Sequence, residues 1–489
     1  MRRKGHHQLS FVFADSPRGG GDVGGSGEPE RRSWLLHTAK HKTMTSSFTR
    51  AADSNRLLEA VASEANLARA LLSVVRNKGA PGIDGQTVEE AEAQAPRLLT
   101  ELRRVLLAER FYPGDIRRVW IPKPGGGQRG LGIPNVRTRV VQQAVLQILE
   151  PIFEPTFHPS SHGFRRNRGA HTAIAEATEY LEEGFRTVVD LDLAQFFDRV
   201  HHQRLLDRMS QRVADRRILN LIRRMLKSAV VMPDGTRIEV VEGTPQGGPL
   251  SPFLSNIVLD EFDQEMARRG LRFVRYADDA NVFVRSERAG IRVMASLRRF
   301  LEERLRLQVN EEKSGIRKPE QVHFLGFCFR CTDGVSSIEV ALSRKTKRRL
   351  LTTIRDMTPP NWGRSIMTCM ADLGRYLNGW SAYYRLCTAE VASELGVIDA
   401  HVRRRLRAII VRQKKRPRFL FRYLLSRGVS RKAAAGTAYC GKGSWAKSNR
   451  PGIVRAYPPS WFHGRLISLK ARWHELNPPR VNNQFVLAL

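Results

Sequence analysis

Two adjacent aspartates, Asp278 and Asp279, lie between two short apolar runs of the chain. Residues 271–276 and 280–284 are both rich in strand-forming side chains, which predicts a hairpin with the two carboxylates at its tip. Neighbouring carboxylates repel each other unless a cation lies between them, and Mg2+ is a hard ion that prefers such oxygen ligands. A solvated polar turn is the alternative, and the motif alone does not decide between the two.

A second acidic motif lies on a predicted strand over residues 187–193. Asp190 and Asp192 are two positions apart, so both project from the same face of that strand. A strand-end aspartate beside a hairpin-tip pair is what a two-metal phosphoryl-transfer site requires, with the ions ~4 Å apart. We therefore expect Asp192 to join Asp278 and Asp279. For Asp190 and Asp198 we prefer structural roles, as a solvated strand end and a helix N-cap.

The charge of the chain indicates a polyanionic partner. Its 489 residues include 82 Lys and Arg against 48 Asp and Glu, a net charge of +34. A pI near 11.0 is typical of nucleic-acid binding. Residues 341–489 hold 30 of the basic residues and 6 of the acidic ones. At 41% hydrophobic residues the chain is not wholly disordered, and it has no run of eighteen apolar residues that predicts a membrane span.

The five cysteines do not resemble a disulfide framework, because their number is odd and their spacing irregular. Cys328 and Cys331 form a C-x2-C pair, and His323 could be a third zinc ligand, but no fourth ligand is evident. We expect buried, reduced thiols on a strand and a reducing compartment.

Apolar periodicity predicts the order of the other elements. Residues 1–45 are expected to be unstructured, with a loop at 77–85 and a hairpin over 230–241. Further strands are predicted over 119–122 and 321–329. Helices are predicted over residues 54–74, 88–109, 137–152, 170–183, 250–269 and 288–305, and helices with Arg-rich faces over 343–427.

Several motifs in this order resemble the reverse transcriptase/maturase proteins of bacterial group II introns, over residues 54–475. Beside the acidic strand and the Tyr276–Asp279 hairpin, the resemblance rests on residues 78–85 (KGAPGIDG), 121–124 (IPKP), 131–134 (LGIP), 161–165 (SHGFR), 243–252 (GTPQGGPLSP), 307–313 (LQVNEEK) and 324–327 (FLGF).

The resemblance implies an α+β fold. It would be a right-hand polymerase, with fingers and a palm containing an antiparallel sheet, followed by a helical thumb and a basic RNA-binding maturase domain. The implied divisions are a disordered extension (1–45), fingers and palm (46–340), thumb and maturase domain (341–430) and a basic nucleic-acid-binding segment (431–489).

The resemblance also implies roles for individual residues. Asp192, Asp278 and Asp279 would be the catalytic acids that hold two Mg2+ ions. Phe197 would lie under the nucleotide sugar and exclude a ribose 2′-OH, with core packing as the alternative. The other implied nucleotide-binding residues are Lys123 and Arg129 for the triphosphate, Gln246 against the nucleotide and Lys313 near the pyrophosphate. The expected RNA-binding residues are Arg403, Arg404, Arg405, Arg407, Lys414, Lys415 and Arg416.

The implied function is RNA-templated DNA synthesis from a primer 3′-OH with dNTPs, together with binding of the parent group II intron RNA to assist splicing and retromobility. The partners would be intron RNA, an RNA template and a DNA primer, without a membrane; the sequence defines no oligomeric state. The expected location is the bacterial cytoplasm, at the nucleoid when bound to target DNA. After Cys440 only His463 and His474 remain, so no Cys/His nuclease domain is expected. Two alternatives stay open: a host-adopted reverse transcriptase in repair or phage defence, and an RNA-binding splicing chaperone without polymerase activity.

Overall fold

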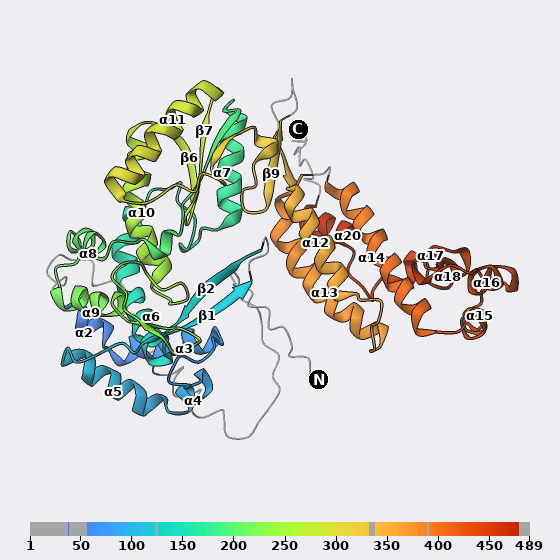
Figure 1. The fold of residues 1–489 in the computed structure, drawn as a ribbon, viewed down its shortest axis with the longest axis horizontal. Helices are drawn as coiled ribbons and strands as arrows, with labels where there is room; N and C mark the ends of the chain where they lie inside the picture. Colours follow the sequence, from blue (N-terminus) through green and yellow to red (C-terminus); the bar gives the residue numbers. More distant parts are fainter. Residues whose placement is uncertain (1–37, 39–55, 123–125, 332–337, 389–390, 479–489) are drawn as a thin grey trace, which may run out of the picture. The chain divides into compact units, whose positions relative to one another are not determined.

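The computed structural model describes residues 38, 56–122, 126–331, 338–388 and 391–478. The N-terminal extension expected over 1–45, residue 38 excepted, and Lys123 lie outside the described residues. The chain divides into two compact units, one of residues 1–177 and 189–316 and one of 178–188 and 317–489 (Figure 1). The boundaries expected at residues 340 and 430 remain predictions.

The first unit begins with helices. Two of the long helices predicted from the sequence are each divided into two shorter ones. The helix expected over 54–74 is two helices, because the Ser63 side chain accepts a hydrogen bond from Asn66 N and starts a new helix. The helix expected over 88–109 is also divided, and Pro96 lies in the first turn of its second part. These helices are α2 (Leu57–Val61), α3 (Glu64–Arg76), α4 (Val88–Ala93), α5 (Ala95–Leu107) and α6 (Val136–Phe153).

A four-stranded sheet follows, in the order β2-β1-β4-β5. β1 (Ile116–Pro122) pairs antiparallel with β2 (Gln128–Ile133), and β4 (Val230–Val231) pairs antiparallel with β5 (Arg237–Ile238). The hairpin predicted over 230–241 is confirmed, although its strands are short. β2 was not predicted, because its two glycines give it little strand propensity of its own and pairing with β1 defines it.

The second sheet of this unit has the order β6-β7-β3-β8 and contains both acidic motifs. The predicted hairpin is confirmed as β6 (Arg272–Tyr276) and β7 (Asp279–Val284), and the strand predicted over 187–193 as β3 (Thr187–Asp192). Its fourth strand is β8 (Gly315–Arg317). Nearby helices are α7 (Ala170–Glu182), α10 (Ser251–Arg268) and α11 (Glu287–Arg299), and α11 continues into a π-helical turn at Phe300–Leu305.

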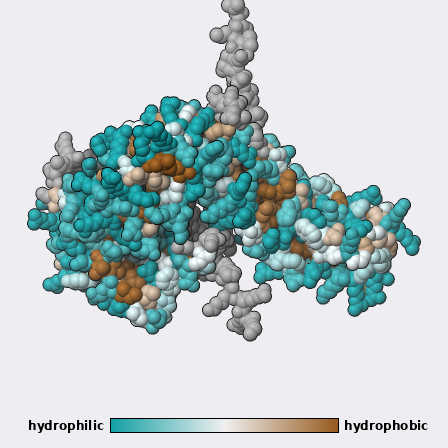
Figure 2. Space-filling view, turned by 45° about the horizontal axis from the view of Figure 1, so that its top comes forward, coloured by the Kyte–Doolittle hydropathy of each residue, from teal (hydrophilic) through white to brown (hydrophobic). Residues whose placement is uncertain are grey.

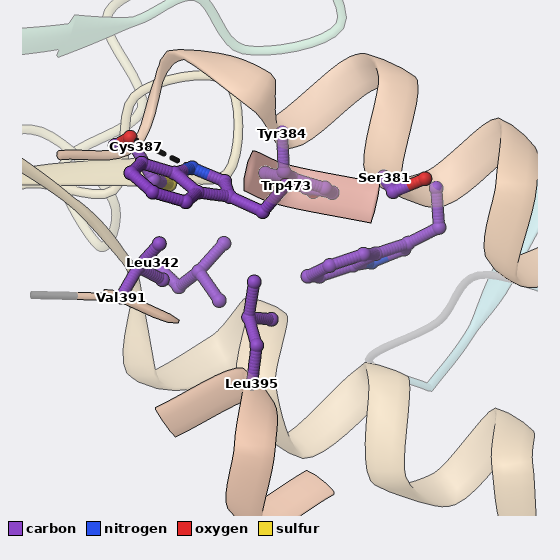
Figure 3. Close-up of a pocket in the computed structure, with 8 residues that line it drawn as sticks. Leu342, Ser381, Tyr384, Cys387, Val391, Leu395 and Trp473 are labelled. Atoms are coloured by element: carbon purple, nitrogen blue, oxygen red, sulfur yellow. Dashed lines mark hydrogen bonds between the residues drawn. The ribbon is translucent and has the colours of Figure 1, made fainter. Parts of the chain in front are cut away.

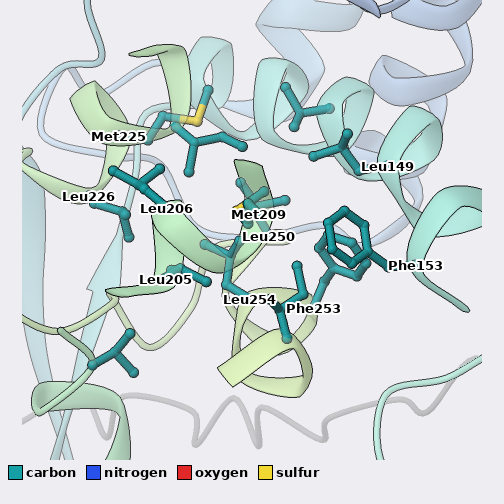
Figure 4. Packing of buried hydrophobic residues seen from close by; sticks show 14 of the residues in the cluster. Leu149, Phe153, Leu205, Leu206, Met209, Met225, Leu226, Leu250, Phe253 and Leu254 are labelled. Atoms are coloured by element: carbon teal, nitrogen blue, oxygen red, sulfur yellow. The ribbon is translucent and has the colours of Figure 1, made fainter. Parts of the chain in front are cut away.

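Two helices that the sequence analysis did not predict, α8 (His202–Ser210) and α9 (Arg216–Leu226), complete the core of the first unit. Figure 4 shows Leu205 and Met209 of α8 packed with residues of α6, α9 and α10. Phe153 and Phe253 meet there edge to face, with ring centroids 5.6 Å apart. Burial of each such side chain contributes ~1.5–3 kcal/mol to the free energy of folding. This packing holds α10 in place beside the second sheet.

The second unit combines a hairpin with helices, as predicted for residues 343–427. β9 (Phe327–Cys331) pairs antiparallel with β10 (Ile338–Leu342). The helices of its described part are α12 (Arg344–Met357), α13 (Ile366–Tyr383), α14 (Val391–Gln413), α15 (Pro417–Ser426), α16 (Arg431–Ala438), α17 (Ser444–Lys447), α18 (Pro451–Ala456), α19 (Pro459–Phe462) and α20 (Leu469–Leu476). Within the described residues, no helix is both long enough and apolar enough to span a membrane.

The strand expected over 321–329 was placed too early, because a tight turn precedes β9. Leu325 and Gly326 have φ of 52° and 91°, and Phe324 and Phe327 exchange two backbone hydrogen bonds around them. Gly326 is required here, since a Cβ would lie 2.6 Å from the Tyr384 hydroxyl oxygen. The FLGF motif is therefore a turn that packs against the end of α13.

Trp473 of α20 anchors this helix in the second unit. Its indole N–H donates to the Cys387 carbonyl oxygen at 3.0 Å (Figure 3). The cavity beside it measures about 10 Å³, just large enough for one water molecule. It is lined by Leu342, Trp380, Ser381, Tyr384, Cys387, Val391, Leu395 and Trp473.

All five cysteines are free thiols, as predicted. Cys328 and Cys387 are buried, and burial raises the pKa of Cys387 to about 12, which keeps this thiol protonated and unreactive. His323 Nδ1 lies 2.7 Å from Ser343 Oγ. In the part of the chain that the structure describes, His323 and the C-x2-C pair form no metal-binding cluster.

We predict that replacing Asp399 by alanine weakens the docking of α20. Asp399 is buried on α14, and its carboxylate accepts hydrogen bonds from Ser468 Oγ at 2.7 Å, Leu469 N at 2.8 Å and Lys470 N at 3.1 Å. Loss of such a cap costs ~1–2 kcal/mol, so amide exchange in α20 should be about tenfold faster.

Asp372→Ala is the matched control, because Asp372 is paired with Arg375 on the surface of α13. This variant should change the free energy of unfolding by less than ~0.5 kcal/mol. Equal exchange rates for α20 in the two variants would contradict the assignment of Asp399 as its cap.

Candidate active site

The β6–β7 hairpin holds two of the predicted acids at its turn. Tyr276 pairs with Asp279, so Ala277 and Asp278 form a two-residue connection. Ala277 has φ of 57°, a left-handed conformation that costs a residue with a Cβ ~1–2 kcal/mol. Surrounding contacts must offset this cost, and strain of this kind is typical of functional sites.

The third predicted acid, Asp192, lies at the end of β3, the neighbour of β7 in the sheet. The alternating pattern of the strand buries Val189 and Leu191 on one face and leaves Asp190 and Asp192 on the other. The LQVNEEK segment fixes the strand end. Asn310 N donates to the Asp192 carbonyl oxygen at 2.8 Å, and Asp192 N donates at 2.9 Å to the Oγ of Ser314, the residue that follows the segment.

Burial is the main reason that the pKa of Asp279 lies well above its ordinary value. The negative charges of Asp190, Asp278 and Asp192 raise this pKa further, in that order. Burial also raises the pKa of Asp278, and the charge of Asp192 adds to that effect. The four carboxylates therefore lie near enough to repel one another, and a bound cation would relieve this repulsion.

Asp190 and Asp198 differ from the structural roles expected for them. Asp190 is half-buried, and of the three neighbouring carboxylates it has the largest effect on Asp279, so it is not simply a solvated strand end. Asp198 is exposed in a short 3-10 turn. The N-cap of α8 is His201 instead, whose ring accepts a hydrogen bond from Arg204 N.

Lys313 neutralises part of the acidic cluster, because its Nζ lies 2.8 Å from Asp192 Oδ2. The predicted pyrophosphate lysine is thus close to the predicted metal ligands. Among the described residues, no three His, Cys, Asp or Glu side chains are grouped closely enough to bind a metal ion. Asp192 therefore lies on the strand next to the hairpin acids, but its carboxylate pairs with Lys313 and does not close a metal site with them.

Two of the predicted nucleotide-binding residues contact each other. Arg129 of β2 is exposed, and its Nε donates to Gln246 Oε1 at 3.0 Å. The TPQGG loop that carries Gln246 lies along β2, since Gly132 N donates to the Gln246 carbonyl oxygen at 2.9 Å. Gly247 is needed for this approach, because a Cβ would lie 2.5 Å from the Gly132 carbonyl oxygen.

Phe197 lies in the short turn after β3 and is half-buried, whereas Phe196 is fully buried. The two rings meet edge to face with centroids 5.4 Å apart. Thr244 N donates to the Phe197 carbonyl oxygen at 2.6 Å, which connects the turn to the TPQGG loop. The ring of Phe197 therefore keeps an exposed part on a fixed backbone.

Arg275, which the sequence analysis did not single out, supports the turn from below. It is 1% exposed on β6, and its guanidinium donates to Asp263 of α10 through Nε at 2.6 Å and Nη2 at 2.5 Å. Its Nη1 donates to the Ala277 carbonyl oxygen at 2.8 Å. The sequence signal was a charged residue between Val274 and Tyr276, at a position where an unpaired cation could not be buried.

The SHGFR motif supports the same hairpin from its other side. His162 N donates to the Arg275 carbonyl oxygen at 2.9 Å, and Arg275 N donates to that of Ser160 at 2.8 Å. His162 is buried, with Nδ1 2.8 Å from Thr172 Oγ1 and Nε2 2.7 Å from Glu176. Gly163 lies directly against Ala277. The motif is therefore part of the framework around the acidic turn.

The predicted RNA-binding residues of the second unit fall into three groups. Arg405 and Arg407 use their guanidinium groups inside the protein. Arg405 donates to the Thr358 side chain at 2.5 Å, and Arg407, 7% exposed, donates twice to the Tyr457 carbonyl oxygen. Lys415 and Arg416 are exposed beyond the end of α14. Of the others, Arg403 is half-buried, Arg404 lies over the Trp445 ring and Lys414 over the Tyr423 ring.

Comparisons with known proteins agree with this arrangement. Residues 121–329 match the family of reverse transcriptases (RNA-dependent DNA polymerases), and residues 347–427 match the group II intron maturase-specific domain. Protein YkfC of Escherichia coli strain K12 is 35% identical over 301 residues, which is 53% of this chain and 79% of that protein.

Two intron-encoded relatives are similar over shorter shares. Group II intron-encoded protein LtrA of Lactococcus lactis subsp. cremoris is 27% identical over 341 residues, 56% of each chain. The putative COX1/OXI3 intron 1 protein of Saccharomyces cerevisiae is 31% identical over 213 residues, 41% of this chain and 25% of that protein.

The chain belongs to the family of group II intron-encoded reverse transcriptases with a maturase domain. It has the mixed helical and sheet fold of a reverse transcriptase, and it is an RNA-directed DNA polymerase by family. Enzymes of this class use divalent metal ions.

We predict that Gly163→Ala distorts the acidic turn. A Cβ at this position would overlap the backbone nitrogen of Ala277, and neither backbone can give way cheaply. Overpacking of this kind costs ~1–3 kcal/mol, measured as a lower urea midpoint of unfolding. Gly374→Ala in α13 is the control, since no atom lies within 4 Å of its Cβ and a helical alanine should be neutral or stabilising. A lower midpoint in both variants would contradict the prediction.

Proposed function

We propose that this protein synthesises DNA on an RNA template from a primer 3′-OH, as a right-hand polymerase. Fingers and palm would comprise residues 46–340, the thumb and maturase domain residues 341–430, and the basic nucleic-acid-binding segment residues 431–489. The observation that supports this proposal most is the juxtaposition of Asp278 and Asp279, at a strained turn, with Asp192 on the neighbouring strand. Such a concentration of like charge is unfavourable without a cationic partner.

Asp192, Asp278 and Asp279 would hold two Mg2+ ions. The donor chemistry fits, because carboxylate oxygens are the ligands that Mg2+ prefers. Among the described residues these side chains are not grouped closely enough to bind an ion, so binding would bring the Asp192 carboxylate, which pairs with Lys313, closer to the hairpin acids. When bound, the ions activate the primer 3′ oxygen and stabilise the leaving pyrophosphate. Lys313, paired with Asp192, adds a positive charge on the side where pyrophosphate would leave.

The incoming dNTP would contact Lys123, Arg129, Gln246 and Phe197. Arg129 and Lys123 supply charge for the triphosphate, and the contact between Arg129 and Gln246 keeps the β2 strand and the TPQGG loop in one arrangement. The exposed part of the Phe197 ring would lie under the sugar and clash with a ribose 2′-OH.

The maturase role would use the basic surface of the second unit. Residues 341–489 carry a net charge of +24 of the total +34. Hydrophilic residues cover most of the face shown in Figure 2. Lys415 and Arg416, whose side chains are exposed, are the strongest candidates for contacts with intron RNA phosphates. We further propose that the protein serves splicing and retromobility of its intron, and acts at the nucleoid when bound to target DNA.

We predict that Asp278→Ala reduces primer extension on an RNA template by about a hundredfold to a thousandfold. The substitution removes a ligand of the Mg2+ ions that would stabilise the negative charge developing in the transition state. Incorporation of a single labelled dNTP measures the effect. Asp234→Ala is the matched control, because Asp234 also occupies a hairpin turn of the first unit but is exposed. Equal activity of the Asp278 variant and wild type would exclude the proposed polymerase site and favour the splicing chaperone.

We predict that the double variant Lys415→Gln/Arg416→Gln binds its intron RNA more weakly, without a change in primer extension on a short template. Each phosphate contact that is lost should reduce the salt slope of log Kd by about one. Filter binding over a series of KCl concentrations measures the slope. Arg288→Gln, an exposed arginine on α11 of the first unit, is the control. An unchanged slope in the double variant would remove these two residues from the RNA surface.

A further inference from the structure

All five N–H donors of the Arg275 guanidinium are hydrogen-bonded inside the protein, and they connect three segments of the first unit. Besides the two bonds to Asp263 and the bond to the Ala277 carbonyl oxygen, Nη1 donates to Asn256 Oδ1 at 3.2 Å and Nη2 to Ser161 Oγ at 2.7 Å. Asp263 is 0% exposed, and Asn256 lies on the same helix, α10. The guanidinium thus joins α10 and the SHGFR motif to the acidic hairpin.

Stability alone does not explain this buried ion pair. Two charges lose their hydration when they are buried, and apolar side chains of similar volume often stabilise a core equally well. A guanidinium differs from an apolar group in that its planar donors fix the direction of each partner. The feature to explain is therefore which partner needs a fixed direction.

The Ala277 carbonyl is that partner. Ala277 has a left-handed φ, and its carbonyl belongs to the peptide plane that leads directly to the nitrogen of Asp278. The bond from Arg275 Nη1, at 2.8 Å, holds that plane in one orientation. A fixed plane at this point determines where the Asp278 side chain leaves the backbone.

Asn256 closes the arrangement around the turn. Its Oδ1 accepts from Arg275, and its Nδ2 donates to the Gly163 carbonyl oxygen at 2.9 Å. Gly163 in turn packs against the backbone of Ala277. The strained residue is thus held by a hydrogen bond on one side and by backbone contact on the other.

We propose that Arg275 is a positioning residue for polymerisation: it holds the Ala277–Asp278 peptide so that Asp278 and Asp279 have the geometry that the reaction needs. This inference rests on the proposed function. Arg275 itself is buried and acts only through the turn. Its loss should lower kcat more than it changes the KM for dNTP, because substrate contacts remain while the reacting geometry is lost.

The test compares three variants with wild-type protein. Arg275→Met leaves Asp263 buried without a partner, so it also tests folding. Arg275→Met/Asp263→Leu removes the unpaired charge and should unfold at a higher temperature than the single variant. Arg275→Lys retains the charge but not the planar fork. The control is Arg208→Met, which breaks ion pairs with Asp260 and Glu261 of the same helix without touching the turn.

For each variant we would measure kcat and KM for dNTP in primer extension, the Mg2+ concentration for half-maximal rate, and amide exchange of residues 276–279. In the double variant we expect kcat to fall about tenfold to a hundredfold, the Mg2+ requirement to rise and the turn to exchange faster, with KM within about threefold of wild type. Arg275→Lys should recover part of kcat, and Arg208→Met should match wild type.

A folded double variant with wild-type kcat, Mg2+ requirement and turn exchange would overturn the proposal. Faster exchange in Arg208→Met as well would also count against it, because the effect would then be general destabilisation. If wild-type protein extended no primer, the proposed function would fail, and amide exchange of the turn would still decide whether Arg275 holds it in place.

Discussion

Mutual repulsion among the carboxylates of β3 and the neighbouring β6–β7 hairpin is the constraint on which this structure depends. Burial raises the pKa of Asp279 most, and the negative charges of Asp190, Asp278 and Asp192 raise it further. A polypeptide would separate these charges if only its own stability mattered. The strained Ala277 turn, the bonded end of β3 and the Lys313 ion pair hold them together, so much of the first unit serves to maintain an unfavourable arrangement.

The motifs that gave the family resemblance have distinct physical tasks within this arrangement. The SHGFR segment and the TPQGG loop are parts of the framework, since one packs on the acidic hairpin and the other on β2. The FLGF motif is a turn that fits under Tyr384 in the second unit. Short motifs around an active site can therefore have packing as their main task, while few of their side chains face the substrate.

Basic residues of the second unit show that charge alone does not define a binding surface. Arg407 and Lys415 lie within the same basic stretch, but Arg407 is buried on the Tyr457 carbonyl oxygen, whereas Lys415 faces solvent. Arg407 lies on the face of α14 that packs inside the second unit, whereas Lys415 lies beyond the end of that helix. When a long helix carries several basic residues in succession, some of them lie on the face that packs against other helices. The guanidinium groups of those residues then donate hydrogen bonds to backbone carbonyl oxygens.

The sequence by itself determined the β6–β7 hairpin, the acidic strand β3, the free thiols and the helical, basic character of residues 343–427. Each of these follows from local alternation, spacing or composition. Only the tertiary structure decided the presence of β2 and the partners of Arg275. Strand pairing and buried ion pairs join residues far apart in the chain. Their energy comes from desolvation and geometry that no local pattern records.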